Sequence, residues 1–551
     1  MKKYKKYVLG CSLFASMGIA AFHAEDKYFE IAKNLDIFAT LYKEVNTLYV
    51  DELNPAKMIR VGIEAMLAQL DPYTNFYPED DIEEVRTMST GKFNGIGATL
   101  TPYKGAFYVT NVYKDSPADV VGIKIGDEVL AIGKISITNR TELEVSRLLK
   151  GQTGTSVRIT LKRYGVAKPI FFEVARGVVK TPNVPHYGMV NEEVGYIQLT
   201  DFSPTAASEI KDAFEELKAS GMKKVILDLR NNPGGLLNMS IDICNFFLPK
   251  GQTIVETRGR LPEWNKVYKA MNNPLDTEIP VAVLINSGSA SASEIVSGTL
   301  QDYDRAVVIG QQSFGKGLVQ ITKDLSFNAK LKVTTAKYYT PSGRCIQAVD
   351  YSNRKEDGSV GKIADSLRRS FTTQAGRIVY DGGGVQPDVI TPAKTFSVVT
   401  NELIRQRKIF DFATRYYHEN NPANIPGKGF LITDETYNSF VEWLVMQNFS
   451  YVTPLEKQLL SLKKTLEESL LKETVNGEIK AIEQKIRQDK QEDLKKFKEE
   501  IRDLLSMEIV GRYHYQNTAK FIAFEKDVEV QTAVSILQNS SKYAELLRVK
   551  K

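Results

Sequence analysis

The feature that most constrains this fold is an alternation of apolar runs and amphipathic segments between about residues 193 and 392. Short apolar runs predict buried strands, and the segments between them repeat apolar residues at helical spacing. Strands that alternate with helices predict an α/β layer, in which helices pack against a sheet. We expect strands at 194–199, 224–229, 281–285 and 306–309, and helices at 205–220, 236–247 and about 291–301.

The rest of the 551-residue chain differs in pattern from this α/β region. At ~150 residues per domain, a chain of this length predicts three or four domains. The first part is helical in pattern, short β-rich runs follow, and the last part is helical and highly charged. We therefore expect a helical region at 25–90, a β-rich domain at 91–176, an α/β core at 177–396 and a charged helical domain at 397–551.

Two long stretches of the last part differ in their expected role. The run at 457–505 is amphipathic, and its charges most simply form a solvated face. The residues from Tyr513 to the C-terminus have the pattern of a terminal segment that docks on the rest of the protein.

Charge and cysteine content exclude several classes of function. The formal net charge is +5, which is small for this length. Proteins that bind nucleic acid concentrate Lys and Arg far more strongly, so no nucleic-acid partner is expected. Beyond Cys11, the chain has only Cys244 and Cys345, which form no disulfide framework and fit no metal-site spacing. We expect both to be buried small residues.

The first 24 residues have the pattern of a signal peptide. Lysines precede an apolar stretch at 7–22, and polar residues follow it. Cleavage is expected after Ala24, with Ala21 as the alternative. An uncleaved anchor is a third alternative, because ~20 apolar residues can just span a bilayer. The pattern predicts an exported protein, either periplasmic or anchored in the inner membrane on the extracytoplasmic side.

The β-rich domain carries two glycine motifs, Gly95-Ile96-Gly97-Ala98 and Gly126-Asp127-Glu128-Val129-Leu130. A glycine-flanked loop before a strand exposes backbone N–H groups, which can hold a terminal carboxylate while a peptide adds to the strand edge. With the order of its predicted elements, this segment resembles a PDZ domain. The resemblance implies that Gly95, Ile96, Gly97 and Ala98 bind the C-terminus of a substrate. Alternatively, the glycines only make tight turns.

A run of serines and small residues follows the predicted strand 281–285: Asn286-Ser287-Gly288-Ser289-Ala290-Ser291-Ala292-Ser293-Glu294. A serine at a strand-to-helix junction projects from a helix N-terminus, where N–H groups and the dipole favour developing negative charge. The small neighbours leave room for a substrate carbonyl. An isolated run of this kind is also typical of a helix cap, so a partner motif has to decide between the two interpretations.

That partner motif is Phe314-Gly315-Lys316-Gly317-Leu318-Val319-Gln320. We expect the apolar side chains of Phe314, Leu318 and Val319 to enclose Lys316. Such burial desolvates the ammonium group and lowers the pKa of the lysine. A lysine that is neutral near pH 7 can serve as a general base for a serine nucleophile. Lys316 and Gln320 share one face of an extended segment, so Gln320 can accept a hydrogen bond from the lysine amine. A helical segment would bring the two residues together as well.

Histidine, the usual base for a nucleophilic serine, has no natural candidate beside this serine motif. The four histidines are His23, His186, His418 and His514, and none lies next to the motif in the α/β region. The chain also has no His-Glu-x-x-His motif for a metal-dependent site. The sequence therefore favours a Ser–Lys pair without a metal.

The order of these motifs resembles the carboxyl-terminal processing (tail-specific) serine proteases, over roughly residues 30–392. The resemblance rests on the PDZ-like segment, Asp228-Leu229-Arg230-Asn231-Asn232-Pro233-Gly234-Gly235, the serine run and the lysine motif. It implies a crotonase-like α/β catalytic core and a nucleophile 25 residues before the lysine. That spacing selects Ser291 rather than Ser289 or Ser293, with Lys316 as the base and Gln320 as its orienting partner.

The same resemblance implies an oxyanion hole made by backbone N–H groups. They belong to Ala292 and to either Gly234 or Gly235, and the sequence leaves both alternatives open. For Asp228 and Arg230, a buried pair that supports the fold is as good an interpretation as a catalytic role.

The implied activity is that of an exported serine endopeptidase without a cofactor. It would recognise protein or peptide substrates with apolar free C-termini through the PDZ-like domain and cleave them through an acyl-enzyme. The rival interpretations are a non-catalytic peptide-binding or chaperone-like protein and a crotonase-like acyl-CoA enzyme. The part at 397–551 has no motif that we can match. Capping of the protease, formation of a homodimer or docking of an adaptor protein, and restraint of substrate access remain open for it.

Overall fold

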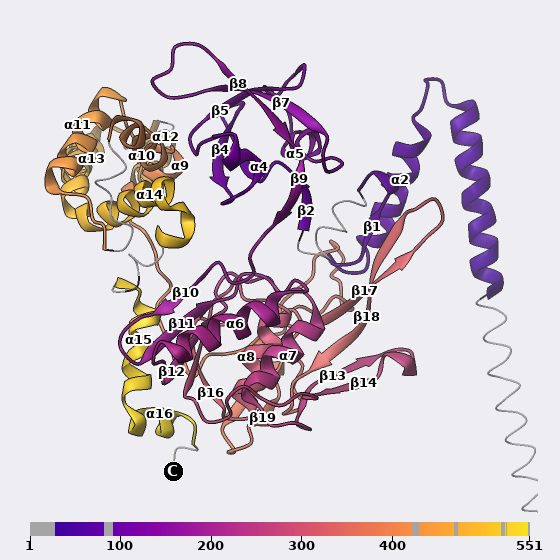
Figure 1. Ribbon diagram of the computed structural model, residues 1–551. Helices are drawn as coiled ribbons and strands as arrows, with labels where there is room; N and C mark the ends of the chain where they lie inside the picture. Colours follow the sequence, from indigo (N-terminus) through magenta and orange to yellow (C-terminus); the bar gives the residue numbers. More distant parts are fainter. Residues whose placement is uncertain are drawn as a thin grey trace, which may run out of the picture. The chain divides into compact units, whose positions relative to one another are not determined.

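The computed structural model describes residues 28–81, 92–420, 429–467, 472–519, 524 and 526–548 (Figure 1). The chain forms two compact units: residues up to 79 with 320–334, and the remaining residues. The predicted leader at 1–24 lies outside the described residues. Among the residues that are described, no helix has both the length and the apolar composition that a membrane span requires.

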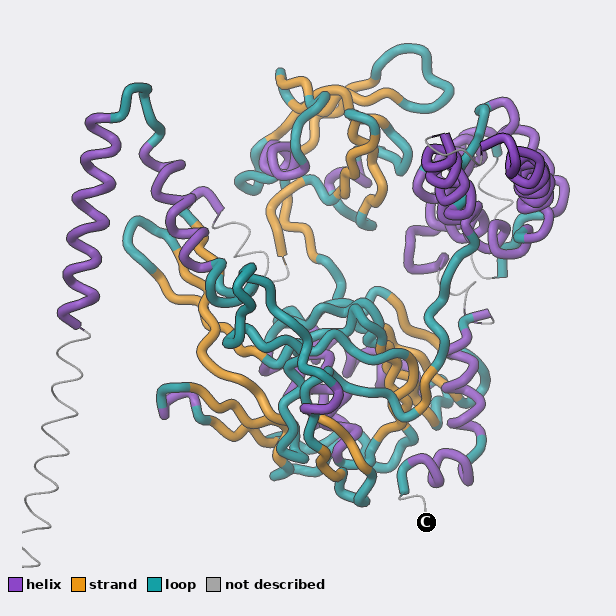
Figure 2. Tube along the Cα trace, turned by 180° about the vertical axis from the view of Figure 1, so that it is seen from behind, coloured by secondary structure: helices purple, strands orange, loops and turns teal. Residues whose placement is uncertain are grey.

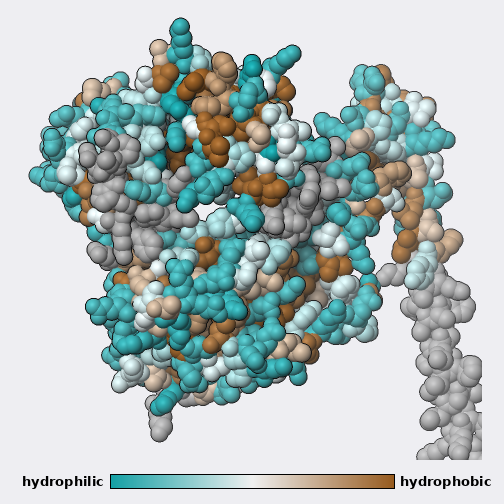
Figure 3. Space-filling view, viewed as in Figure 1, coloured by the Kyte–Doolittle hydropathy of each residue, from teal (hydrophilic) through white to brown (hydrophobic). Residues whose placement is uncertain are grey.

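The smaller unit begins with two helices. Residues 28–48 are helical, and α2 (Pro55–Leu67) starts after Asn54, whose side chain accepts a hydrogen bond from the Lys57 N–H. Within this unit β1 (Asn75–Tyr77), which was not predicted, pairs antiparallel with residues 330–332 of β18. Figure 3 shows hydrophobic patches along the first helix, whose exposed apolar side chains include Tyr28, Phe29, Leu35, Ile37 and Leu41.

The β-rich domain of the larger unit is a sheet in which β3, β4, β5, β7 and β8 are neighbours in that order. β3 is therefore an edge strand, and α5 packs beside it over a shared apolar core. Its elements are β2 (Lys92–Gly95), β3 (Ala98–Tyr103), β4 (Ala106–Val112), α4 (Pro117–Val120), β5 (Glu128–Ile132), β6 (Ile135–Ser136), α5 (Glu142–Leu149), β7 (Ser156–Lys162), β8 (Ile170–Ala175) and β9 (Gly177–Lys180).

The α/β core is built on a sheet of order β10-β11-β12-β15-β16-β21, parallel except for β10. All predicted strands and helices of this region are confirmed, whereas β10 and β21 were not predicted. Its elements are β10 (His186–Met189), β11 (Val194–Gln198), α6 (Ala206–Ala219), β12 (Lys224–Asp228), α7 (Leu237–Phe247), β15 (Val281–Ile285), α8 (Ala292–Asp302), β16 (Ala306–Gly310) and β21 (Val389–Ile390).

Side chains along β15 alternate between the two faces of this sheet. Val281, Val283 and Ile285 join the core formed with α6, α7 and α8, whereas Ala282 and Leu284 pack with residues of α15 (Val528–Gln538). A strand that is buried on both faces must be apolar throughout, which explains its unbroken apolar sequence. The core is thus a sheet between two helical layers (Figures 1 and 2).

Three neighbouring parallel strands of this sheet end at the same edge. β12 ends at Asp228, β15 at Ile285 and β16 at Gly310, and the register aligns Asp228 with Leu284 and Ile285 with Gly310. The segments that follow these strands therefore begin side by side, and in open α/β sheets this edge is where ligands bind.

Further strands and turns lie around the core. β13 pairs with β14 and with residues 336–339 of β18, and β19 pairs with β20. Cys244 is buried as expected, Cys345 is only half-buried, and both are free. The strands are β13 (Thr253–Gly259), β14 (Lys266–Lys269), β17 (Leu318–Asp324), β18 (Lys330–Tyr339), β19 (Ser370–Thr372) and β20 (Ile378–Tyr380).

The C-terminal part is helical, as predicted, and most of it has an apolar core of its own. The amphipathic run expected at 457–505 is divided among α12, α13 and α14, while α15 packs on the sheet instead. The helices are α9 (Val398–Arg405), α10 (Lys408–Glu419), α11 (Asp434–Met446), α12 (Pro454–Glu467), α13 (Lys472–Lys496), α14 (Lys498–Ala519) and α16 (Ser540–Leu546).

Because β15 is buried on both faces of the sheet, we expect a core substitution in it to lower the stability of the protein. Leu284 is fully buried between β15 and α15, so Leu284→Ala should lower the free energy of unfolding by ~2–5 kcal/mol, because it removes apolar contacts and leaves a cavity. Urea unfolding followed by circular dichroism measures this loss. Leu367→Ala, at a residue that is 73% exposed, is the control and should cost under ~0.5 kcal/mol. Equal losses would contradict the assignment of Leu284 to the core.

Candidate active site

Ser291 lies where the segment after β15 turns into α8. It occupies the N-cap position of α8 with φ 56° and ψ −114° and is half-buried. A positive φ is uncommon for a residue with a Cβ, and such strained backbone clusters at functional sites. The turn presents Ser291 at the helix N-terminus, beside N–H groups that no earlier helical turn can satisfy.

The two neighbouring serines of the run are buried and hydrogen-bonded within the fold. The Ser289 hydroxyl donates to the carbonyl of Leu229 at 2.8 Å and accepts from the Asn286 N–H at 3.0 Å. The Ser293 hydroxyl donates to the carbonyl of Asn232 at 3.0 Å. Both side chains therefore tie the serine run to the segment after β12, while Ser291 alone of the three is partly exposed.

The segment after β12 passes directly against the serine. A Cβ added to Gly234, which has φ +100°, would lie 2.7 Å from the Cβ of Ser291 and 2.9 Å from the nitrogen of Ala292. Only glycine allows this approach, because any side chain would fill the space in front of the Ala292 N–H. The N–H of Gly234 donates to the side chain of Asn232 at 2.9 Å.

The N–H groups of Gly235 and Ala292 have no hydrogen-bond acceptor among the described residues. Gly235, with φ +150°, forms a β-bridge with Phe202. The hydrogen bonds of this bridge run from the Phe202 N–H to the Gly234 carbonyl and from the Leu236 N–H to the Phe202 carbonyl, so they do not use the Gly235 N–H. The sequence left Gly234 and Gly235 as alternative oxyanion donors. The Gly234 N–H already donates a hydrogen bond within the fold, whereas the Gly235 N–H donates none to the residues described.

Asn232 is a site residue to which sequence reasoning assigned no role. It is fully buried. Its side-chain NH₂ donates to the backbone carbonyl of Leu199 at 2.8 Å, and its backbone carbonyl accepts from the N–H of Ala290 at 3.0 Å. Asn232 thus joins β11, the turn after β12 and the serine run. The sequence offered only its position within the Asn-Asn-Pro-Gly-Gly turn as a signal.

The lysine motif lies beside the serine run through backbone contacts. The Phe314 N–H donates to the Ser289 carbonyl at 3.0 Å. The buried hydroxyl of Tyr338 bridges the two segments, at 3.0 Å from the Ser291 carbonyl oxygen and 2.5 Å from the Lys316 carbonyl oxygen. The structure thus brings the backbones of the two principal predicted residues together.

The side chain of Glu294 links the serine run directly to the lysine motif. One of its carboxylate oxygens accepts the N–H of Ser291 at 2.9 Å and the N–H of Lys316 at 2.8 Å. The other accepts the Gly315 N–H at 2.7 Å and the Ser313 hydroxyl at 2.5 Å. Glu294 ends the serine motif, and sequence reasoning assigned it no role, although Ser-x-x-Glu is the sequence pattern of a capping box and could have identified it.

Burial governs the ionisation of Glu294. The side chain is fully buried, and desolvation raises its pKa to about 7, although its hydrogen bonds with Ser313, Lys316, Ser291 and Gly315 act in the opposite direction. The group therefore changes charge near neutral pH. Its ionised form has acceptors for all four donors, whereas a protonated carboxyl places a hydrogen toward one of them.

The three apolar residues predicted to enclose Lys316 differ in how far each is buried. Leu318 is buried and Val319 is half-buried, whereas Phe314 is 52% exposed. Gly315, between Phe314 and Lys316, has φ +88°, and a Cβ there would lie 2.3 Å from that of Ala348. Lys316 itself is half-buried.

Gln320, predicted as the partner of the lysine, lies in β17. Its amide donates to the hydroxyl of Thr334 at 3.1 Å, and the N–H of Thr334 donates to the hydroxyl of Thr74 at 3.3 Å. The role of Gln320 beside the lysine remains a prediction.

The predicted peptide-binding loop leads into the edge strand β3. Gly97 has φ +78°, and a Cβ on it would lie 2.2 Å from that of Ser116. The Gly97 carbonyl accepts hydrogen bonds from the Tyr113 N–H and the Ser116 hydroxyl, both at 3.0 Å. Ile96 is buried, and Ala98 begins β3 next to α5. An edge strand beside a helix is the arrangement that peptide addition requires.

Comparison with known proteins follows the same division of the chain. Residues 193–352 match peptidase family S41, residues 108–163 match a PDZ domain, and residues 399–537 match the family described as "Probable PDZ-protease, C-terminal helical domain". The last match covers the part in which sequence reasoning found no motif.

Individual relatives carry protease names. A "Carboxy-terminal-processing protease" of Bartonella bacilliformis is 36% identical over 358 residues, which are 63% of this chain and 81% of the relative. A "Probable CtpA-like serine protease" of Staphylococcus aureus is 29% identical over 435 residues, 78% of this chain and 85% of the relative. Among solved structures, a photosystem II D1 C-terminal processing protease has 23% identity and a TM-score of 0.35, and the match covers 64% of this chain and 92% of that one.

The extent of these matches decides between the interpretations that the sequence left open. The family is one of peptidases, which disfavours both an acyl-CoA enzyme and a protein that only binds peptides. The PDZ domain, the α/β core and the C-terminal helical domain follow one another along the chain as separate matches. This chain is a serine-type peptidase and belongs to the carboxy-terminal-processing proteases of peptidase family S41.

Proposed function

We propose that this protease is exported, recognises the C-termini of protein or peptide substrates through its PDZ domain, and cleaves them with Ser291 as nucleophile and Lys316 as general base. The observation that carries the proposal is that one carboxylate oxygen of Glu294 accepts hydrogen bonds from the backbone N–H groups of both Ser291 and Lys316. A carboxylate in this place fixes the nucleophile and the base relative to each other.

Three observations support Ser291 as the nucleophile within its run. The hydroxyls of Ser289 and Ser293 are committed to backbone carbonyls, whereas Ser291 is partly exposed on a strained turn. The spacing to Lys316 implied by the family resemblance points to the same serine. Ser291 is therefore the serine of the run that both its setting in the structure and the family spacing favour.

For the oxyanion hole we propose the N–H groups of Gly235 and Ala292. The N–H of Gly234 already donates to Asn232, and Gly234 instead provides the space in front of Ala292. Fixed backbone donors aimed at a developing oxyanion are worth about 10²- to 10³-fold each in rate.

The proposed reaction runs in two halves. Lys316 in its neutral form takes the proton of the Ser291 hydroxyl as the serine oxygen attacks the substrate carbonyl carbon, and the two N–H groups hold the resulting oxyanion. The peptide bond then breaks, and its nitrogen takes the proton from the Lys316 ammonium. Water hydrolyses the remaining ester with Lys316 again acting as base, which restores Ser291. Gln320 is proposed to orient the lysine amine.

Recognition is assigned to the loop of Gly95, Ile96, Gly97 and Ala98. A substrate would extend the β3 edge, its terminal carboxylate held by loop N–H groups and its apolar last residues lying between β3 and α5. The leader pattern at 1–24 supports export, to the periplasm or to an anchored position on the extracytoplasmic side. For the domain at 397–551, contact with a second copy or with an adaptor protein remains part of the proposal.

The catalytic pair can be tested by substitution. Ser291→Ala and Lys316→Ala should each lower kcat by ~10³-fold or more on a fluorogenic peptide with an apolar free C-terminus, because each removes a member of one catalytic unit. Ser208→Ala and Lys323→Ala, at exposed positions that make none of the site contacts described above, are the controls and should retain full activity. Cleavage by either site variant at the wild-type rate would refute the assignment.

Carboxylate recognition can be tested on the substrate side. Amidation of the peptide C-terminus should lower kcat/KM by ~10- to 100-fold, the equivalent of one charge-assisted hydrogen bond of ~1.5–3 kcal/mol. Gly97→Ala should reduce this discrimination, since the new Cβ would displace Ser116.

Gly154→Ala is the matched control, because Gly154 also has a positive φ but no neighbour within 4 Å of the added Cβ. It should discriminate between the free and amidated peptides as the wild type does. Equal cleavage of both peptides by the wild type would show that recognition does not use the carboxylate.

Glu294 makes a pH prediction. Its pKa is raised to about 7, so its contribution to stability is fully present below pH ~4.5 and is lost as the pH rises through 7. The wild type should therefore lose unfolding free energy relative to Glu294→Gln between pH 5 and pH 8. Activity should change in the opposite direction, because the ionised form has acceptors for the N–H groups of both Ser291 and Lys316.

At pH 8, Glu294→Gln should lower kcat by ~10- to 100-fold, because its amide group would face backbone donors. Urea unfolding and initial rates across this pH range measure both effects, and Glu215→Gln on the exposed face of α6 is the control. A kcat for Glu294→Gln equal to that of the wild type at pH 8 would show that the carboxylate does not organise the site.

A further inference from the structure

The helix α15 lies across the sheet face opposite α6, α7 and α8. It buries Val530, Ala533 and Leu537 against a face formed by β11, β12, β15 and β16 (Figures 1 and 2). Its N-cap residue, Asp527, and its second residue, Glu529, lie at the edge where β12 and β16 end, because their partners follow those two strands. The start of α15 therefore meets the edge of the sheet that carries the active site.

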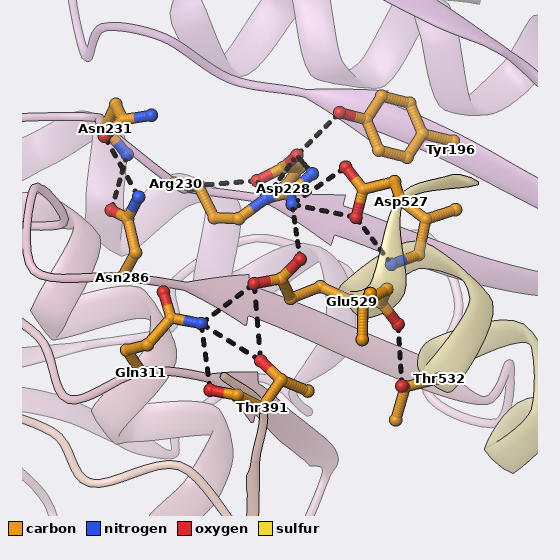
Figure 4. Close-up of polar contacts among 12 residues, drawn as sticks. Tyr196, Asp228, Arg230, Asn231, Asn286, Gln311, Thr391, Asp527, Glu529 and Thr532 are labelled. Carbon is orange, nitrogen blue, oxygen red and sulfur yellow. Dashed lines mark hydrogen bonds and ion pairs between the residues drawn. The ribbon is translucent and has the colours of Figure 1, made fainter. Parts of the chain in front are cut away.

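One arginine joins this helix to the turn at residues 232–235, which we name the oxyanion turn because it contains the proposed oxyanion donor Gly235. Arg230, two residues beyond β12, points its guanidinium at three carboxylates (Figure 4). Its Nη2 lies 2.6 Å from Asp228, and its Nη1 lies 3.0 Å from Asp527 and 3.2 Å from Glu529. The Tyr196 hydroxyl donates to Asp228 at 2.6 Å and holds that carboxylate in place. Arg230 directly precedes Asn231, Asn232 and the glycine turn.

The second carboxylate oxygen of Glu529 contacts the segment after β16, which leads to Lys316. It accepts the Gln311 amide at 2.8 Å, and the same amide donates to the hydroxyl of Thr391 at 3.0 Å (Figure 4). Gln311 is the first residue after β16, and its N–H donates to the carbonyl of Ile285 at 3.1 Å. It begins the segment that leads to Ser313, Gly315 and Lys316. A single carboxylate therefore bridges the segments that carry the oxyanion turn and the general base.

We propose that Asp527 and Glu529 are positioning residues of the active site, which hold Arg230 and Gln311 so that the oxyanion turn and the lysine segment keep their spacing at Ser291. The inference rests on the proposed Ser291 and Lys316 chemistry and assigns part of that site to the C-terminal segment. A protease in which these two carboxylates are neutral folds but turns over slowly.

A purely structural role would be the simpler interpretation of such ion pairs, and two observations argue against it. The apolar face of α15 already fixes the helix to the sheet. When Asp527 and Glu529 are neutral, Arg230 keeps its ion pair with Asp228, so its buried charge is not left unpaired. In addition, both partners of the carboxylates begin active-site segments. Catalysis is sensitive to such placement, since a shift of ~1 Å can cost ~10²-fold in rate.

The test uses the full chain with Asp527→Asn, Glu529→Gln and both together. Each should lower kcat by ~10- to 100-fold on the free C-terminal peptide and leave KM within about twofold. The urea midpoint should stay close to that of the wild type, and labelling of Ser291 by a fluorophosphonate should slow in parallel with kcat. Glu545→Gln on α16, an exposed carboxylate 3.8 Å from Lys542, is the matched control and should change none of these values.

A double-mutant cycle adds a readout that a general loss of stability does not move. Glu529→Gln and Gln311→Leu should be non-additive in kcat, because both break the same contact. Unchanged kcat in the folded variants, or a loss of kcat that only follows the unfolded fraction, would overturn the inference. Failure of the underlying function is distinguishable, because then Ser291→Ala and Lys316→Ala would cleave as the wild type does.

Discussion

The buried carboxylate of Glu294 is the contact on which the site depends. It accepts N–H groups from the serine turn and from the lysine segment, which come from different parts of the chain. A fully buried carboxylate is costly unless its lone pairs are used, so the fold supplies four donors to it. The pKa near 7 reflects this balance of burial and hydrogen bonding.

The parallel sheet explains why such a carboxylate can reach both segments. β12, β15 and β16 are neighbours and end at one edge, so the glycine turn at 232–235, the serine turn and the lysine segment begin next to one another. Asn232, Tyr338 and Glu294 then join them in pairs. The outer layer contributes as well, since α15 brings Glu529 to Arg230 and Gln311 at the same edge. The site is therefore shared among segments far apart in the sequence.

Much of the fold was predictable from local patterns. The apolar runs of the core became β11, β12, β15 and β16, because strands buried on both faces leave an unmistakable composition. Short strands without such runs, β1 and β21 among them, were missed because pairing with distant partners forms them. The expected cover of Lys316 by Phe314 stays a prediction, because Phe314 is 52% exposed and the burial of a side chain depends on neighbours that a local pattern does not specify.

The sequence by itself indicated a serine-type peptidase, because Ser291 and Lys316 stand in motifs whose residue types suit the proposed nucleophile and base. It also determined the order of the domains. Only the tertiary structure decided which of three serines is partly exposed, which glycine N–H already donates a hydrogen bond, and that Glu294 links the two motifs. The physical reason is that hydrogen bonds and burial depend on neighbours brought together by the sheet, including an α15 that follows β15 by more than two hundred residues.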